Sequence, residues 1–272
     1  VWWILGQRLF GWPQLPPEMT RRLKAHWLTL GLVPFMLSAQ GVPAQPPAVE
    51  AGTQLILHTG IHDPTGDLAL RFGAANTVGM GVRRTTASGW RFGFHYRFQT
   101  GSDVREPGLL QNLRDPNGHV IDNEGRIALL TPQQRGTLFF GTLGRKWSLG
   151  WENPETGLIA ELGAGFWEHK IHFQNRGNRV TQLDAPHVEG YDRLSGGTVL
   201  VPRLGIEYHS SSGQVRFHAG VEGLIGRLQP SREWNTDTQT SDTDTRNDAA
   251  WGLFAGWILR LKARTTSIDY YH

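Results

Sequence analysis

The sequence predicts an all-β fold: a closed, antiparallel, up-and-down transmembrane β-barrel of eight strands. Three observations lead to this prediction. Beyond residue 50 the hydrophobic residues recur with a period of two, eight such segments are long enough to cross a bilayer, and long and short connections alternate between them. A hydrophobic content of 39% and a mean hydropathy of −0.36 fit strands that are apolar on one face only.

The clearest alternation lies in residues 90–99, where aromatic residues occupy every second position and Arg, His and Gln lie between them. The same pattern recurs in 198–209, 215–226 and 251–262. Because the polar face carries ions in the middle of the strands, we expect that face to line a lumen and the apolar face to contact lipid. The expected lipid-facing residues are Phe92, Phe94, Tyr96, Phe98, Phe217, Trp251, Leu253 and Trp257. The expected lumen residues are Arg91, His95, Arg97, Glu161, Arg203, Glu207, Arg216, His218, Glu222 and Arg260.

The connections support a barrel more strongly than the strands do. The predicted strands are 53–61, 76–86, 89–100, 134–147, 157–174, 197–210, 214–228 and 249–264. Long polar connections at 62–75, 101–133, 175–196 and 229–248 alternate with short turns near residues 88, 155 and 212. Long outer loops and short periplasmic turns are typical of outer-membrane barrels. A hairpin within 109–130 would raise the count to ten strands. Pro202, inside the sixth strand, predicts a bulge there or the first membrane residues of that strand.

The N-terminal region predicts export. Residues 19–44 have the pattern of a signal peptide: Arg21, Arg22 and Lys24, a short apolar stretch from Trp27 to Leu37, and small residues up to Ala44. The apolar stretch is too short to span a bilayer of about 30 Å. We interpret residues 1–18 as upstream sequence translated from a mis-assigned start, 45–52 as a linker, and 53–272 as the barrel. The predicted location is therefore the outer membrane of a Gram-negative bacterium.

The lumen charges have both signs, and eight strands leave an interior that side chains can fill. Because unpaired buried charges are costly, we expect a paired network and no solute pore. A narrow channel or a barrel that binds a small ligand is the alternative. A formal charge of +3 without a dense basic patch argues against a nucleic-acid partner.

Candidate catalytic and metal-binding residues are scattered. His169, His172, His187 and the His209-Ser210 pair have no spacing that fixes a nucleophile beside its base, so we expect no enzyme. An outer-membrane enzyme acting on lipid or peptide remains the alternative. Acidic residues gather in the fourth long connection, at Asp237, Asp242, Asp244 and Asp248. They lack the Gly and terminal Glu of an EF-hand loop, so a solvated loop is favoured over a calcium site. No cofactor and no metal is expected.

Tryptophans and a short loop motif complete the predicted sites. Trp147, Trp151, Trp167, Trp234, Trp251 and Trp257 are expected in the aromatic belts at the membrane interfaces. The run Tyr191-Asp192-Arg193 precedes the sixth strand. It is expected either to order its own loop or to dock a partner.

Four stretches carry a family resemblance. They are Gly66–Leu68 with Arg71–Gly73, Gly163–Phe166 with His169–Ile171, Gly190–Gly197, and Gly256–Leu259 followed by the ending Asp269–His272. Together they resemble small outer-membrane barrel proteins of Bacteroidota over essentially the whole mature chain. The resemblance implies location and fold more than activity, although some small barrels of that phylum are accessory components of type IX secretion or gliding machinery. We therefore expect a structural or accessory component of a secretion or envelope-assembly complex, in contact with outer-membrane lipid and with other envelope proteins.

Overall fold

The computed structural model describes residues 51–261, apart from 152, 154, 176, 178, 179, 213 and 214. The predicted upstream segment, the signal peptide and all but the last two residues of the predicted linker lie outside the described residues. Within the described residues, no helix is long and apolar enough to cross a membrane.

Eight strands form a closed barrel in the described part of the chain, which confirms the predicted fold class. They are β1 (Gly52–Gly66), β2 (Ala75–Thr85), β3 (Trp90–Gly101), β4 (Leu130–Ser148), β5 (Gly157–Asn175), β6 (Ser195–His209), β7 (Arg216–Pro230) and β8 (Arg246–Leu261). Each strand pairs antiparallel with its sequence neighbours, and β1 pairs with β8 to close the ring. The region 109–130 contributes only isolated bridges, so the ten-strand alternative is wrong.

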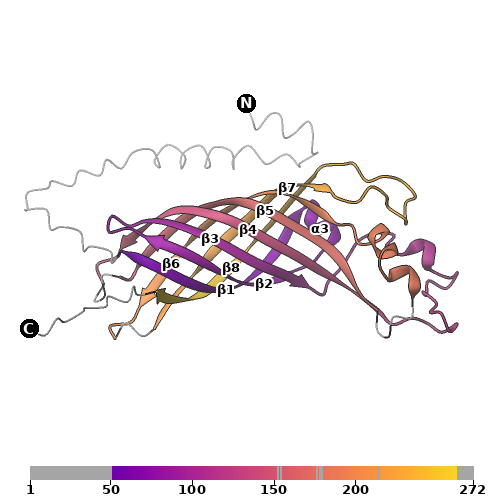
Figure 1. The fold of residues 1–272 in the computed structure, drawn as a ribbon, viewed down its shortest axis with the longest axis horizontal. Coiled ribbons are helices and arrows are strands. Elements are labelled where there is room, and N and C mark those ends of the chain that lie inside the picture. The colour runs from indigo at the N-terminus through magenta and orange to yellow at the C-terminus, as the bar shows by residue number, and fades with distance from the viewer. Residues whose placement is uncertain are drawn as a thin grey trace, which may run out of the picture. The chain divides into compact units, whose positions relative to one another are not determined.

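The long connections gather at one end of the barrel and the short turns at the other (Figure 1). We name the long connections L1 (67–74), L2 (102–129), L3 (176–194) and L4 (231–245). L1 contains the short helix α3 (Asp67–Arg71), L2 the 3₁₀ turn η1 (Gln111–Leu113), and L3 the 3₁₀ turns η2 (Thr181–Leu183) and η3 (His187–Gly190). The start of β1 and the end of β8 lie together at the short-turn end, where Thr53 pairs with Leu261.

The outer surface of the strands carries an apolar belt. Its exposed residues include Leu57, Met80, Val82, Phe92, Phe94, Tyr96, Phe139, Leu143, Leu162, Leu200, Leu204, Val221, Trp251, Leu253, Trp257 and Leu259. Along β8 the belt runs from Trp251 to Leu261. Ten residue steps of about 3.3 Å, tilted by about 40°, span roughly 25 Å, which is the height of the apolar band of membrane barrels. The side chains beyond the belt towards L2 and L3, such as Arg135 and Lys170, are polar.

Pro202 causes no bulge. Leu200 pairs with Ile225 and Arg203 pairs with Glu222, so the β6–β7 register is the same on both sides of the proline. The ladder is interrupted at Val201 and Pro202 because proline has no amide hydrogen to donate. The missing backbone contact therefore stays local, and the predicted bulge is wrong.

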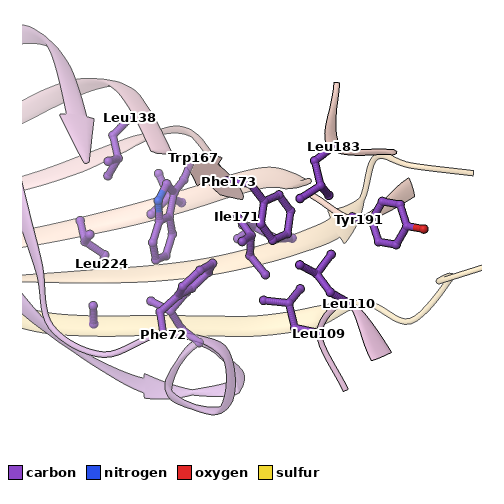
Figure 2. Packing of buried hydrophobic residues seen from close by; sticks show 14 of the residues in the cluster. Phe72, Leu109, Leu110, Leu138, Trp167, Ile171, Phe173, Leu183, Tyr191 and Leu224 are labelled. Carbon is purple, nitrogen blue, oxygen red and sulfur yellow. The ribbon is translucent and has the colours of Figure 1, made fainter. Parts of the chain in front are cut away.

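Strand β4 departs from the alternation of apolar and polar residues seen in the other strands. Leu138 and Phe140 are buried and Phe139 is exposed, so both faces of this strand are apolar here. The inward residues belong to a hydrophobic cluster that fills the loop end of the barrel and continues between the loops (Figure 2). Phe72 and Leu68 reach this cluster from L1, and Leu110 and Leu183 reach it from L2 and L3. The loop end is therefore closed by a packed core.

Candidate functional site

A continuous chain of ion pairs crosses the middle of the barrel; we call it the charged interior. Glu222 of β7 contacts Arg97 of β3 at 2.6 Å and Arg203 of β6 at 3.0 Å. Arg203 continues to Glu161 of β5, with 2.9 Å between Nη1 and Oε2. Because the barrel brings β3 and β7 to opposite parts of one ring, residues 125 positions apart in the chain meet here.

The chain continues from Glu161 towards the short turns. Arg91 places Nε 2.9 Å from Glu161 and Nη2 2.9 Å from Glu207. Glu207 also accepts hydrogen bonds from Arg83 at 2.6 Å and from Lys146 at 2.9 Å. Each carboxylate of the charged interior thus contacts at least two cations, the arrangement that lets buried charges persist.

Aromatic rings and histidines pack against these charges. The Arg97 guanidinium lies 4.8 Å from the Phe140 ring centroid, and that of Arg203 lies 4.2 Å from Phe254. His95 stacks on Phe140, and His218 meets Phe254 edge-on. His62 bonds Glu222 at 2.9 Å. Cation–π contacts of this kind contribute about 2 kcal/mol when desolvated.

The predicted lumen residues divide into two groups in the structure. Eight are buried inside the barrel: Arg91, His95, Arg97, Glu161, Arg203, Glu207, His218 and Glu222. Arg216 and Arg260 lie near the short turns and are partly exposed, with Arg260 3.9 Å from Glu155. The predicted lipid-facing residues all point outward, and seven are more than a third exposed. Phe98, the eighth, is half-buried beneath the Arg135 guanidinium.

Several interior residues were not predicted from the sequence, and three of them show why. Arg83 and Lys146 are buried members of the charged interior. Trp167, expected at a membrane interface, is 0% exposed and donates from Nε1 to Gln99 at 3.0 Å inside the barrel. Its indole fills the lumen below the loops because its parity matches the inward residues of β5. The expectation that Trp167 belongs to an interfacial belt is therefore wrong.

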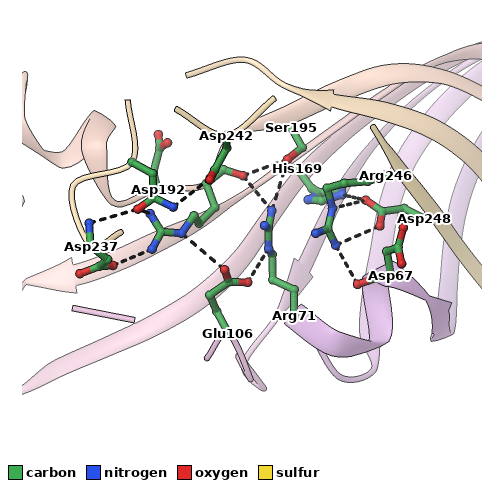
Figure 3. A network of polar contacts seen from close by, with 12 residues as sticks. Asp67, Arg71, Glu106, His169, Asp192, Ser195, Asp237, Asp242, Arg246 and Asp248 are labelled. Carbon is green, nitrogen blue, oxygen red and sulfur yellow. Dashed lines mark hydrogen bonds and ion pairs between the residues drawn. The ribbon is translucent and has the colours of Figure 1, made fainter. Parts of the chain in front are cut away.

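At the loop end, all four long connections are joined by one line of alternating charges; together they form what we call the loop cap (Figure 3). Arg71 of L1 donates to Glu106 of L2 at 2.6 Å. Glu106 lies 3.4 Å from Arg193 of L3, and Arg193 contacts Asp237 of L4 at 2.7 Å. Burial lowers the pKa of Arg71, and the Glu106 carboxylate opposes that shift. The cap is held by contacts across L1–L4.

Hydrogen bonds outside the ion pairs reinforce the cap. Asp237 accepts a hydrogen bond from the Leu110 amide at 3.0 Å, and Asn112 donates to the Thr236 carbonyl at 3.0 Å. Asn123 donates to Thr181 at 2.8 Å, which ties L2 to L3. Because buried backbone amides must find partners, these bonds fix the loop conformations.

The predicted partner motif serves the cap itself. Tyr191, Asp192 and Arg193 are all buried, with 4%, 2% and 6% of their surface exposed. Asp192 accepts two hydrogen bonds from Arg232 of L4, and Arg193 bonds Asn235 as well as Asp237. These contacts bury the three side chains in the loop cap and hold L3 against L4.

One histidine meets a carboxylate in a way that invites comparison with a catalytic site. His169 Nε2 lies 2.7 Å from Asp248 Oδ2, and Ser195 is its backbone partner on β6 (Figure 3). The Ser195 hydroxyl donates to the Arg193 carbonyl and accepts from Arg71. All three residues are at most 1% exposed. The serine is therefore neither activated by the histidine nor open to a substrate.

The acidic residues of the fourth long connection do not converge. Asp237 binds Arg193, Asp242 accepts from Asn235, and Asp248 binds His169 and Arg246. Among the residues that the structure describes, no group of three or more His, Cys, Asp or Glu side chains is placed to hold a metal ion.

Comparisons with known proteins found only distant structural likeness. No family model matches the sequence, and no curated protein matches it. Neisserial surface protein A aligns with a TM-score of 0.45 and 9% identity over 78% of this chain and 99% of that one. Ail of Yersinia pestis, in complex with the heparin analogue sucrose octasulfate, gives 0.37 and 11% over 78% and 100%. The outer membrane protein OprG from Pseudomonas aeruginosa gives 0.34 and 10% over 79% and 99%. Because these scores are low, the fold rests on the strand pairing described above.

Proposed function

We propose that the chain is an integral barrel of a Gram-negative outer membrane. The apolar belt supports this location, because a soluble protein gains nothing from a continuous ring of exposed Phe, Leu and Trp side chains. The height of the belt and the polar residues beyond it fit a bilayer. The predicted signal peptide is consistent with export across the inner membrane.

Within that membrane the barrel acts as a closed anchor and neither as a pore nor as an enzyme. The charged interior crosses the lumen, and the hydrophobic cluster and the loop cap cover the end that carries the long loops. The buried His169–Asp248 pair offers no accessible nucleophile. Catalysis requires a nucleophile and base in contact at a site that substrate can enter.

The accessory role is supported by an exposed apolar patch in L2, outside the belt. In L2, Ile121, Ile127 and Leu129 are 41%, 57% and 80% exposed. Leu129 precedes β4, and about eight residue steps separate it from the outward-facing Thr137 near the edge of the belt, which corresponds to roughly 20 Å. Apolar side chains in that position contact neither lipid nor the core, so they favour contact with another envelope or secretion protein. The resemblance to Bacteroidota barrels points to the same class of partner.

Two experiments test this proposal. The first distinguishes a closed anchor from a pore, and the second distinguishes a barrel that binds a partner from one that does not. Reconstituted into planar bilayers, the folded barrel is expected to give no conductance steps. Tagged protein from cross-linked, detergent-solubilised outer membranes is expected to retain a defined partner. Replacing Ile127 and Leu129 by Asp is expected to release that partner, whereas the control Glu124→Gln, on the same loop, is expected to keep it. Conductance steps would contradict the closed anchor, and recovery of the chain alone in every preparation would contradict the accessory role.

A further inference from the structure

A cleft lies between L3 and L4, and its lining includes Tyr191, Arg232 and Thr236 of the loop cap. It encloses about 600 Å³, a volume within the range of small-ligand sites. Its lining includes Gln182, His187, Glu189, Ser231, Trp234 and Thr236. All of these come from the long loops, so the cleft lies at the loop end, outside the apolar belt.

The walls of the cleft are fixed before any ligand arrives. Arg232 of L4 holds both carboxylate oxygens of Asp192, at 3.0 Å and 2.7 Å, and donates to Glu189 of L3 at 2.8 Å. The hydrogen bond with Asp192 raises the pKa of Arg232, so this clamp stays charged at any physiological pH. A rigid site loses little conformational entropy when it binds.

Gly190 brings the two loops into direct contact. The Thr236 amide donates to the Gly190 carbonyl at 2.9 Å. A Cβ atom at position 190 would lie 1.9 Å from the Thr236 hydroxyl oxygen, so any larger residue would force the Thr236 side chain to shift. The floor of the cleft therefore depends on a close backbone contact.

The charged side chains that line the cleft indicate which class of ligand it can bind. Glu189 and Glu233 line the cleft, and the one arginine that faces them is already matched by Asp192. An anionic ligand would meet carboxylates without a free cation and is disfavoured. The remaining groups are hydroxyls, an amide and an imidazole, which offer donors and acceptors together. This mixture suits an uncharged ligand with many hydroxyl groups.

Trp234 supplies the apolar surface that such a ligand needs. Its side chain lines the cleft and is 53% exposed, although indole is among the most costly surfaces to leave in water. A pyranose ring has one face of C–H groups that packs on an indole and a rim of hydroxyls that bind polar side chains. We infer that the L3–L4 cleft binds a neutral sugar, with Trp234 as the stacking face and Glu189 and Gln182 as hydrogen-bonding partners.

Saturation-transfer NMR on the full chain, folded in detergent, tests this inference with maltotriose, laminaritriose and chitotriose as probes. At least one of them is expected to receive saturation at its ring protons. In Trp234→Ala the affinity is expected to fall about tenfold, the effect of losing one aromatic contact. Trp151→Ala, which removes an equally exposed tryptophan at the short-turn end, is expected to leave binding unchanged.

A second variant changes a proposed hydrogen-bonding residue outside the Arg232 clamp. Gln182→Ala is expected to weaken sugar binding severalfold while heat-modifiable gel mobility shows a folded barrel. Sucrose octasulfate and trilysine serve as anionic and cationic probes. The inference is overturned if none of the three sugars binds, if sugar binding does not depend on Trp234, or if either charged probe binds at Trp234 more tightly than the sugars. These results would leave the membrane location and the closed lumen untouched, because the cleft contributes to neither.

Discussion

Replacing Glu222 by Gln tests the charged interior most sharply. Glu222 is 1% exposed and accepts hydrogen bonds from Arg97 and His62 at one oxygen and from Arg203 at the other. Glutamine keeps the shape but replaces one of these acceptors with an amino group. One arginine then faces a donor, and both arginines lose a counter-charge inside the barrel.

The size of the effect follows from the geometry. Removing one member of a buried ion pair costs about 3–5 kcal/mol, because the remaining charge stays desolvated. Arg203 keeps Glu161 at 2.9 Å, so most of the loss falls on Arg97. We therefore expect Glu222→Gln to lower the free energy of unfolding by about 3 kcal/mol, the lower end of that range.

Urea unfolding of the barrel in lipid vesicles, followed by tryptophan fluorescence, measures this change. Glu124→Gln is the matched control, because its pair with Arg126 is about half exposed and contributes less than about 1 kcal/mol. Adding Arg97→Met to Glu222→Gln removes the stranded cation, so the double variant is expected to recover at least about 1 kcal/mol relative to additivity. A loss below about 1 kcal/mol for Glu222→Gln, or strict additivity, would refute the paired interior.

Three further variants test the interior and the loop cap. Trp167→Phe removes the hydrogen bond to Gln99 and is expected to cost about 1–3 kcal/mol in urea unfolding; an unchanged midpoint would show that the indole does not depend on this partner. Gly190→Ala forces the Thr236 hydroxyl away and is expected to speed proteolytic cleavage within L3 and L4, while the stability of the barrel stays unchanged. Cleavage at the same rate as in the unchanged chain would contradict the close contact. Arg193→Met leaves Asp237 without its cation and is expected to raise amide exchange at Leu110 about tenfold; unaltered exchange would mean that the charge line does not hold L2.

The fold could be predicted because a membrane barrel has two features that are visible in the sequence. Apolar and polar residues alternate along each strand, and long and short connections alternate between the strands. In β3 the alternation of aromatic and ionic residues survives almost unbroken, and the structure places each face as expected. The strands β4 and β5 run past the belt, where both faces are less apolar, so β4 starts at Leu130 and not at residue 134. The alternation of apolar and polar residues weakens beyond the membrane, because lipid there no longer requires apolar residues on the outward face.

The interior residues that were missed carried a usable signal. Val82 and Arg84 are exposed, so parity alone places Arg83 inside, between Gln54 of β1 and Gly93 of β3. Trp167 was assigned by residue type, although it shares parity with the buried Glu161. Residue parity is a stronger guide than residue type in a barrel, because the pleat fixes the side of every second residue.

The partners within the loop cap could not be predicted. Arg71 and Arg193 are 122 residues apart, and their meeting over Glu106 depends on how four loops fold over one mouth. Such contacts have no period in the sequence. The sequence singles out Tyr191–Arg193 as a motif, but the contacts of this motif within the cap follow only from the structure, which buries its side chains.

Oxygen accessibility of single spin labels along β3 shows whether the outer face of the barrel contacts lipid. The chain has no cysteine, so one Cys introduced at each position from 90 to 101 reports one site. In lipid vesicles we expect high oxygen accessibility at the even positions from 92 to 98, which face outward, and low accessibility at the odd positions between them. Equal accessibility on both faces, or high accessibility to a water-soluble nickel complex at Phe94, would contradict a barrel that meets lipid with its outer face.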